Sequence, residues 1–480
     1  MVFSSITFLI FFTIVAIIMA ITNVNFLKER FGEKRLRTIK HIILLISSYI
    51  FYGWWDWRFC FLMFGLTYIS YISAKIISQN GKYVKLFKFI GIVVPLVVLA
   101  LFKYFNFFMD SVYDLFGLEG YSTLNIILPV GISFYTFQSM SYTIDVIRKN
   151  IPASSFLDVS LYIAFFPQLV AGPIVKAQEF IPQLKEERDI SFRNLAKGLQ
   201  IFLIGLFKKI VIADNLSVFV DQVFAKPAAF HSITIILAVI SYSIQIYFDF
   251  SGYSDMAIGS AKCLGYDFNR NFNLPYIAKN VSEFWKRWHI SLSTWLQEYL
   301  YIPLGGNRKG KVRTYLNLLA TMVIGGLWHG ASWNFVIWGA LHGVALCVHK
   351  IFASFKKCKK KNILTSLFSV IATYLFVCVC WVPFRSTNTS VTLEIIKRMF
   401  IWQNGIIHIY SWTIIALFVL LVGTVVAIVN SKKNNCKIIS GFYPILNLNK
   451  FTSWLIVFLF AGIIIGLAYT NSNPFIYFQF

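Results

Sequence analysis

Three of the seven histidines, His289, His329 and His342, lie within 54 residues of one another. An imidazole ring titrates near neutral pH, so it can take the proton of a hydroxyl group while the oxygen attacks an acyl carbon. His329 lies near the middle of a long apolar stretch, where a buried ring needs a hydrogen-bond partner. His329 is therefore either a structural histidine or a general base, and its position alone leaves both interpretations open.

The spacing of the histidines bears on whether they can act together. His342 follows His329 by 13 residues. On one straight helix this spacing turns the chain through about 1300°, which places the second ring about 140° away from the first. The two rings would lie on different faces unless the helix breaks near 330–334. For His289 three roles stay open: orienting a substrate, assisting His329, or packing only.

Asp249, Ser254 and Asp255 follow directly on an apolar run. The carboxylates of Asp249 and Asp255 could bind a cation or relay protons, or they could cap helix ends or pair with a basic residue, which we favour. No metal site is expected, because the sequence has no His-x-x-Glu-His or similar spacing. The turn at 305–310 lacks the Gly-Lys-Ser/Thr element of a phosphate-binding loop, although a contact with a phosphate-bearing donor stays open.

Residues 282–299 are predicted to form one amphipathic helix. Spacings of 3, 4, 3 and 4 place on one face the apolar residues Trp285, Trp288, Leu292, Trp295 and Tyr299. Such a helix lies at the membrane surface or in a packed groove, with tryptophans at the level of the headgroups. The seven cysteines show no disulfide or zinc pattern, so Cys378 and Cys380 are expected in the core rather than as nucleophiles.

The elements that must position these residues are unusually apolar. Hydrophobic residues make up 58% of the 480 residues and charged residues 13%, and the mean hydropathy is +0.68. A soluble domain is roughly 45–50% apolar, so lipid must cover much of this surface. Ten to twelve segments approach the length of about 20 residues that a spanning helix needs. They are 3–26, 41–55, 59–77, 89–108, 124–146, 199–222, 232–250, 314–332, 333–349, 363–384, 410–430 and 450–470.

The charges indicate how these segments are oriented. The first segment is interpreted as a retained span with the N-terminus outside, because its basic residues follow the apolar run. The net charge of +24 could suggest a nucleic-acid partner, which we reject because the positive residues lie in short loops between apolar runs. By the positive-inside rule, the cytoplasmic loops are 28–40, 78–88, 350–361 and 431–437, and the external loops are 109–123 and 385–409.

We expect a single membrane domain over 1–480, with N-terminal spans at 1–146, a catalytic core region at 147–350 and C-terminal spans at 351–480. The middle region alone mixes helix breakers and polar residues into apolar sequence. Such residues persist at bilayer depth where they face protein or a water-filled cavity. Pro167, Gly172 and Pro173 predict a broken or re-entrant segment in this region.

Five stretches of the chain are distinctive when taken together. They are FFPQLVAGPI at 165–174, YFDFSGYSDMAIG at 247–259, FWKRWHISLS at 284–293 with YLYIPLGGNR at 299–308, GLWHGASWN at 326–334 and NPFIYFQF at 473–480. In this order they resemble the membrane-bound O-acyltransferase (MBOAT) superfamily, and above all its bacterial branch of alginate and peptidoglycan O-acetyltransferases. The resemblance is densest over 125–345.

The resemblance implies an all-α integral membrane fold, a ring of about 10–12 transmembrane or re-entrant helices around a thin centre where two funnels meet. It implies that His329 is the catalytic histidine, at the constriction, and that His289 is the second functional histidine. Substrate contacts are expected from Trp285, Trp288, Trp328, Asn334, His342, Asp249, Ser254 and Asp255.

The resemblance also implies acetyl transfer across a bacterial cytoplasmic (inner) membrane. The donor would be cytoplasmic acetyl-CoA, with no bound cofactor, and the final acceptor an external polysaccharide of the alginate or peptidoglycan type. A separate SGNH-type acetyltransferase is expected as partner, because the sequence holds no large soluble external domain. His329 would take the acceptor's hydroxyl proton as the oxygen attacks the thioester.

Three alternatives to this function and mechanism stay open. The acyl group could pass through an acyl-histidine or acyl-serine intermediate. The protein could transfer D-alanine to teichoic acid, or it could be a proton-coupled transporter or flippase without acyl chemistry.

Overall fold

The computed structural model describes residues 1–118, 123–170, 172–355, 362–433, 445–469 and 475–476. Throughout these ranges the chain forms helices and their connections, with no β-strand, and a single parallel bridge joins Phe230 to Ile406. The predicted all-α class is therefore confirmed.

Six helical stretches of the described residues are long and apolar enough to cross a membrane. They are Arg58–Ser78, Val84–Phe116, Ser232–Cys263, Trp333–Ala353, Ile363–Arg385 and Ser411–Val429, and two shorter apolar helices are Ile6–Ile21 and Phe451–Leu467. Only 17% of the most apolar window of Ser411–Val429 is buried inside the protein, so lipid must cover its remaining apolar surface. The chain is thus a multi-pass membrane protein, and the ring arrangement of its helices stays a prediction.

The contacts divide the chain into two compact units, one of residues 1–202 with 255–269 and the other of residues 203–254 with 270–480. Two of the three boundaries fall inside the helices α11 (Phe192–Leu206) and α13 (Ser232–Cys263), and the third, between residues 269 and 270, falls in the connection after α13. One membrane domain over 1–480 stays a prediction.

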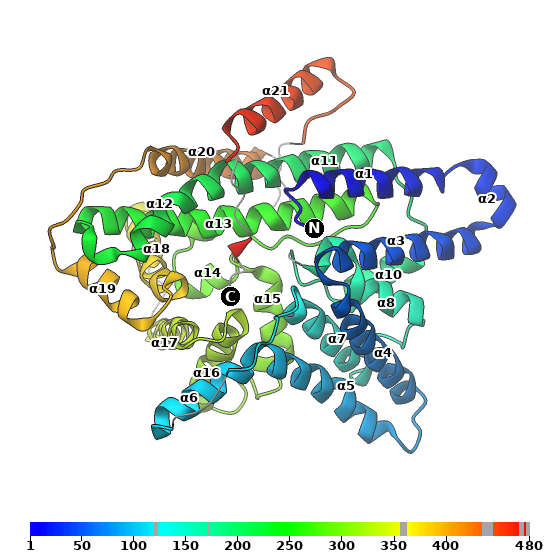
Figure 1. Cartoon of the computed structure of the whole chain (residues 1–480), viewed down its shortest axis with the longest axis horizontal. Coiled ribbons are helices and arrows are strands. Elements are labelled where there is room, and N and C mark those ends of the chain that lie inside the picture. Colours follow the sequence, from blue (N-terminus) through cyan, green and yellow to red (C-terminus); the bar gives the residue numbers. More distant parts are fainter. Residues whose placement is uncertain (119–122, 171, 356–361, 434–444, 470–474, 477–480) are drawn as a thin grey trace. The chain divides into compact units, whose positions relative to one another are not determined.

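The first unit contains the N-terminal helices. They are α1 (Ile6–Ile21), α2 (Asn25–Phe31), α3 (Glu33–Asp56), α4 (Arg58–Ser78), α5 (Val84–Leu99), η1 (Ala100–Tyr104), α6 (Phe105–Phe116), α7 (Ile132–Ile147), α8 (Phe156–Ala164), α9 (Phe166–Leu169) and α10 (Ala177–Lys185). Helix α4 packs against both α5 and α7 (Figure 1). Gly91 permits this approach, since a Cβ there would lie 2.7 Å from Thr143 and 2.9 Å from Ser73.

The predicted break at 165–174 is confirmed within the first unit. Helix α8 ends at Ala164, and α9 is one turn with Pro167 in its first two positions, where its missing N–H costs no hydrogen bond. The residues after α9 do not continue the helix; residue 171 lies outside the described ones. Phe166 of α9 is fully buried and contacts Phe8 and Phe51. This stretch therefore forms part of the core of the first unit.

The second unit contains the remaining helices. They are η2 (Phe207–Ala213), α12 (Asp214–Ala225), η3 (Pro227–Ala229), η4 (Pro275–Ile277), α14 (Val281–Trp285), α15 (Ile290–Leu296), η5 (Gln297–Tyr301), α16 (Lys311–His329), α17 (Trp333–Phe355), α18 (Ile363–Arg385), α19 (Thr389–Phe400), α20 (Ser411–Lys433) and α21 (Phe451–Leu467). The candidate site lies in this unit.

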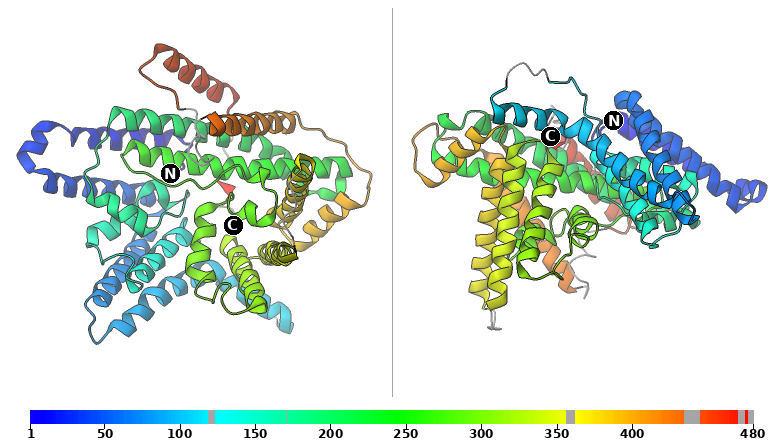
Figure 2. Two further views of the ribbon diagram at one scale, coloured as in Figure 1. Left: turned by 180° about the vertical axis from the view of Figure 1, so that it is seen from behind. Right: turned by 90° about the horizontal axis from the view of Figure 1, so that it is seen from below.

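Helices α16 and α17 form a hairpin, and glycines allow the two helices to pack closely (Figure 1). A Cβ at Gly326 would collide with the carbonyl oxygen of Phe335, and one at Gly339 with that of Met322. Larger residues at these positions would push the helices apart. Helix α18 packs along α17 (Figure 2). The close approach fixes the tip of the hairpin, where α16 ends.

Candidate active site

His289, His329 and His342 belong to one aromatic cluster beside the α16–α17 hairpin, with His329 at the tip. Helix α16 ends at His329, Gly330 is extended with φ −161° and ψ 152°, and α17 begins at Trp333. The helix therefore breaks within 330–334, the case that the sequence had left open. The ring centroids of His329 and His342 each lie 5.0 Å from that of Trp338. The two histidines therefore contact the same indole, which they could not do on one straight helix.

The prediction of one amphipathic helix over 282–299 is wrong. Helix α14 ends at Trp285, and α15 begins at Ile290 after a turn in which His289 has φ 41° and ψ 56°. This left-handed conformation is uncommon for a residue other than glycine, and it often marks a functional site. The turn changes the direction in which the ring of His289 points. The regularly spaced tryptophans therefore do not lie on one continuous helix face.

Asn271 holds this turn in place from a distant part of the chain. Its backbone carbonyl accepts from the amide of Ile290 at 2.9 Å, and its side-chain oxygen accepts from the amide of Ser291 at 3.1 Å. These contacts satisfy amides that the first turn of α15 leaves without an intrahelical partner. The sequence reasoning missed Asn271. The available signal was the run of asparagines at every second position, Asn269, Asn271 and Asn273, between two of the distinctive stretches.

The ring of His289 is fully buried among aromatic groups and polar hydrogen-bond partners. Its centroid lies 4.6 Å from that of Phe250, 6.0 Å from that of Trp328 and 6.3 Å from that of His329. Nδ1 lies 3.1 Å from Oδ1 of Asn271. Burial lowers the pKa of His289 to about 3, so the ring is neutral at physiological pH.

His329 is the last residue of α16 and is 3% exposed. Besides Trp338, the ring meets Phe384 edge-on at a centroid distance of 5.3 Å. The carbonyl groups at a helix C-terminus carry partial negative charge, which stabilises a positive charge on a nearby ring. The site therefore combines a buried imidazole, an apolar wall and a second imidazole whose ring centroid lies 6.3 Å away. Such an arrangement can accept a proton at a position shielded from bulk water.

The predicted tryptophans and His342 form the aromatic wall beside this pair. Nε1 of Trp285 donates to Nδ1 of His342 at 3.3 Å, and the ring of Trp285 also meets Trp338. Trp288 is 1% exposed, stacks on Phe284 and contacts Trp381. These contacts favour a supporting role for Trp285, Trp288 and His342. They hold in place the aromatic rings that lie closer to the hairpin tip.

Asn334 ties the hairpin to the end of α18. Its Nδ2 donates to the carbonyl of Ser386 at 2.9 Å, and its Oδ1 accepts from the hydroxyl of Thr389 at 3.4 Å. Both side-chain groups are therefore used within the protein. The contacts indicate that Asn334 positions the break that follows His329.

The acidic and hydroxyl candidates on α13 have separate surroundings. Asp249 pairs with Lys209 at 2.8 Å, and it accepts from the amide of Ile476 at 2.9 Å. The hydroxyl of Ser254 accepts from Nδ2 of Asn271 at 3.4 Å. Asp255 is buried and belongs to the first unit. The pairing favoured for Asp249 is present, and Ser254 is linked to His289 through Asn271.

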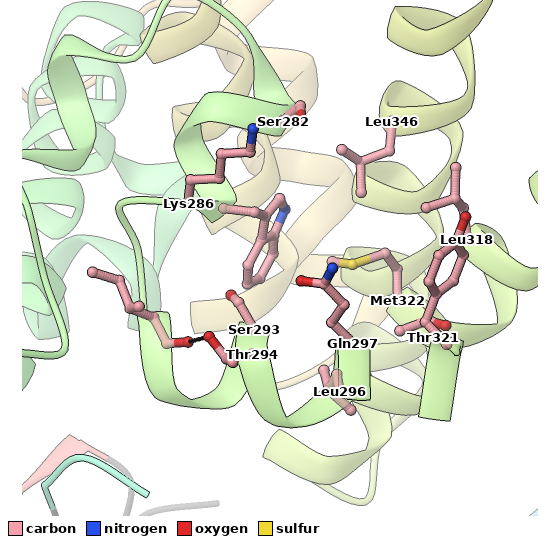
Figure 3. Close-up of a pocket in the computed structure, with 13 residues that line it drawn as sticks. Ser282, Lys286, Ser293, Thr294, Leu296, Gln297, Leu318, Thr321, Met322 and Leu346 are labelled. Carbon is pink, nitrogen blue, oxygen red and sulfur yellow. Dashed lines mark hydrogen bonds between the residues drawn. The ribbon is translucent and has the colours of Figure 1, made fainter. Parts of the chain in front are cut away.

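A cavity of about 400 Å³ opens between α14–α15–η5 and the α16–α17 hairpin (Figure 3). It is lined by Ser282, Trp285, Lys286, Ile290, Ser293, Thr294, Leu296, Gln297, Tyr301, Leu318, Thr321, Met322 and Leu346. Met322 precedes His329 by seven residues, which corresponds to roughly 10 Å along the helix. Trp285 lines the cavity and also donates a hydrogen bond to His342, so its indole borders both the cavity and the histidine cluster.

Among the described residues no group of three or more His, Cys, Asp or Glu side chains could hold a metal ion.

The family model of the membrane-bound O-acyltransferases matches residues 88–381. A probable alginate O-acetylase AlgI of Pseudomonas putida is 37% identical, over 92% of this chain and 94% of its own length. A peptidoglycan O-acetyltransferase of Helicobacter pylori is 39% identical over 76% of this chain and 74% of its own length. A teichoic acid D-alanyltransferase of Bacillus subtilis is 28% identical over 53% and 68%.

The residues that the family model matches include the histidine cluster and helices α14 to α17. The chain belongs to the membrane-bound O-acyltransferase family, and it is an O-acyltransferase.

Proposed function

We propose that this protein transfers an acetyl group from cytoplasmic acetyl-CoA across the bacterial cytoplasmic membrane, for O-acetylation of an external polysaccharide. The alginate and peptidoglycan enzymes among its relatives support the acetyl group and the polysaccharide. A separate SGNH-type protein receives the acetyl group and modifies the polymer.

One observation carries the catalytic part of this proposal. His289 and His329 come from distant parts of the chain, and their rings lie 6.3 Å apart in a buried aromatic site. In the proposed step His329 accepts the proton of the acceptor's hydroxyl while that oxygen bonds to the thioester carbon. The carbon–sulfur bond then breaks, and His329 returns its proton to the leaving thiolate of CoA. The buried site limits the access of water and therefore hydrolysis of the thioester.

The cavity beside Trp285 supports entry of the donor from the cytoplasm. Three of its lining residues, Leu318, Thr321 and Met322, lie on α16 between the basic start of that helix and His329. Lys311 and Arg313 begin the helix, and basic loops mark the cytoplasmic face. Lys286 adds a cation to the cavity itself. A thioester arm in this cavity would direct its acyl end toward the hairpin tip.

Filling the cavity should weaken donor binding without removing the base. In Leu318→Trp the larger ring would occupy part of the cavity, so we expect the KM for acetyl-CoA to rise about 10-fold, an effect of roughly 1.4 kcal/mol. The measurement is the initial rate of acyl transfer against donor concentration. Leu316→Trp is the matched control, because Leu316 lies on the same helix and is 54% exposed. An unchanged KM in Leu318→Trp would remove the cavity from the donor path.

The experiment that tests the proposed function uses purified protein with acetyl-CoA that carries a labelled acetyl group. We expect release of free CoA that depends on the protein and on an acceptor hydroxyl. Transport of acetyl-CoA with no thioester cleavage would instead support a transporter. Turnover of D-alanyl donors with none of acetyl-CoA would support the teichoic acid alternative, for which the similarity is lower and covers about half of this chain.

A further inference from the structure

The hydrogen bonds around Asn271 determine which atom of its amide faces His289. The backbone amide of Ser291 can only donate, and it lies 3.1 Å from the atom assigned as Oδ1. That atom must therefore be the acceptor, the oxygen. The hydroxyl of Ser291 donates to the same oxygen at 2.9 Å. Nδ2 points the other way and donates to the hydroxyl of Ser254 at 3.4 Å, which agrees with this orientation.

The orientation of Asn271 determines the tautomer of His289. An amide oxygen can only accept, so Nδ1 of His289, 3.1 Å from it, must donate. A neutral imidazole carries one N–H, so Nε2 of His289 then bears a lone pair and no proton. The contacts of Asn271 with Ser291, Ser254 and His289 thus determine one tautomer of the neutral ring.

We propose that Asn271 is a positioning residue for acyl transfer: it holds His289 in the Nδ1–H tautomer, so that the ring meets the reaction through an unprotonated Nε2. This inference rests on the proposed function. His289 can then accept a hydrogen bond at Nε2 while His329 gains the acceptor's proton, and it cannot donate one there. His289 and His329 therefore have different roles: His289 accepts a hydrogen bond, and His329 accepts the proton.

The groups that face His289 leave this role to Asn271. From α16 the titratable neighbour is His329, with Trp328 beside it. From α13 the ring meets the uncharged Phe250, and the adjacent carboxylate of Asp249 is held by Lys209. The segment before α14 supplies the neutral amide of Asn271. The contact from Asn271 reaches Nδ1, and so it distinguishes the two ring nitrogens of His289.

Asn271→Asp tests the inference because a carboxylate keeps the acceptor contacts and adds a negative charge beside Nδ1. The charge favours the protonated ring and raises the pKa of His289. Since activity requires an unprotonated Nε2, Asn271→Asp should lose activity toward acidic pH, where its His289 becomes protonated at a higher pH than in the wild type. At the alkaline end activity should approach that of the wild type. Asn271→Leu should instead lose activity at every pH, by roughly 10²-fold.

Asn273→Asp is the matched control, because it adds the same charge two residues away, where the backbone pairs with Arg287. Its pH profile should equal that of the wild type. A purely structural role for Asn271 predicts equal losses at all pH values for Asp and Leu, and this result would overturn the proposal. So would an Asn271→Asp profile that matches the wild type.

A second measurement keeps the test independent of activity and of the stability of the variants. In wild-type protein with ring-¹⁵N histidine, subtraction of the His289→Asn spectrum isolates the signals of His289. We expect a protonated Nδ1 and an unprotonated Nε2 at neutral pH, and the reverse pattern would refute the assigned tautomer. If wild-type protein transfers no acyl group, the proposed function fails, while the tautomer is still decided by these signals.

Discussion

Replacing His329 with alanine or glutamine is expected to abolish acyl transfer. A general base contributes about 10²–10⁴-fold to the rate, and neither replacement can take a proton at neutral pH. The ring is 3% exposed and packs on Trp338 and Phe384, so glutamine is the better replacement for volume. The measurement is the rate of thioester cleavage at saturating donor and acceptor, together with the KM for acetyl-CoA, which should change little.

The control for His329 is another histidine of the same unit. His408 is half-buried, and its described ring contacts are with Phe219 and Tyr410 rather than with the clustered histidines. His408→Ala should retain the wild-type rate. Expression and membrane insertion should be normal for all three variants. Activity near the wild-type level in His329→Gln would remove His329 from the catalytic role.

The second large effect is expected at His289, with asparagine as the replacement. Asparagine adopts the left-handed conformation more readily than most residues, so His289→Asn should keep the turn at φ 41° and fold normally. The His289→Asn variant lacks the imidazole Nε2. We expect its rate of acyl transfer to fall by roughly 10²-fold, which is the loss expected when a reacting group is misplaced. The thermal unfolding midpoint, compared with that of wild type, separates this loss from misfolding.

His289→Ala completes the test at this position. It removes the same ring but is less suited to the left-handed turn, so it should lose both stability and activity. If His289→Asn transfers acyl groups at the wild-type rate, the ring is needed for the fold of the turn and not for the reaction.

The fold class could be predicted from the sequence because lipid selects long apolar helices, and these are visible as continuous runs. The helix break after His329 could be recognised as a possibility, since Gly330 and the polar residues that follow interrupt an apolar stretch. Both features depend on local sequence. Neither required knowledge of which segments touch.

The turn at His289 could not be predicted from periodicity. Trp285, Trp288 and Trp295 keep a helical spacing on both sides of it, and the tryptophan spacing gives no sign of the break. The cap on α15 comes from Asn271, about 20 residues earlier in the chain, through contacts to Ile290 and Ser291. A tertiary contact of this kind leaves no periodic signal, and it decides which way the ring of His289 points.

The family resemblance implies functional roles for His289 and His329, but neither it nor their spacing predicts that the two rings lie together. The sequence alone left His329 undecided between a structural and a catalytic histidine. The ring separation of 6.3 Å and the burial of both rings favour catalysis, because two imidazoles in one buried aromatic site suit proton transfer better than packing. The same structure assigns packing contacts to Asn334 and His342, which the sequence had grouped with the substrate-binding residues.

The most direct test of the central claim is a sided assay in inside-out membrane vesicles. Labelled acetyl-CoA is supplied only to the exposed cytoplasmic face, and the acceptor is enclosed in the lumen. We predict that the acetyl label, and not intact acetyl-CoA, reaches the luminal acceptor with wild-type protein and with His408→Ala, and that His329→Gln transfers none. Label transfer by His329→Gln at the wild-type rate, or arrival of uncleaved acetyl-CoA in the lumen, would contradict acyl transfer at His329.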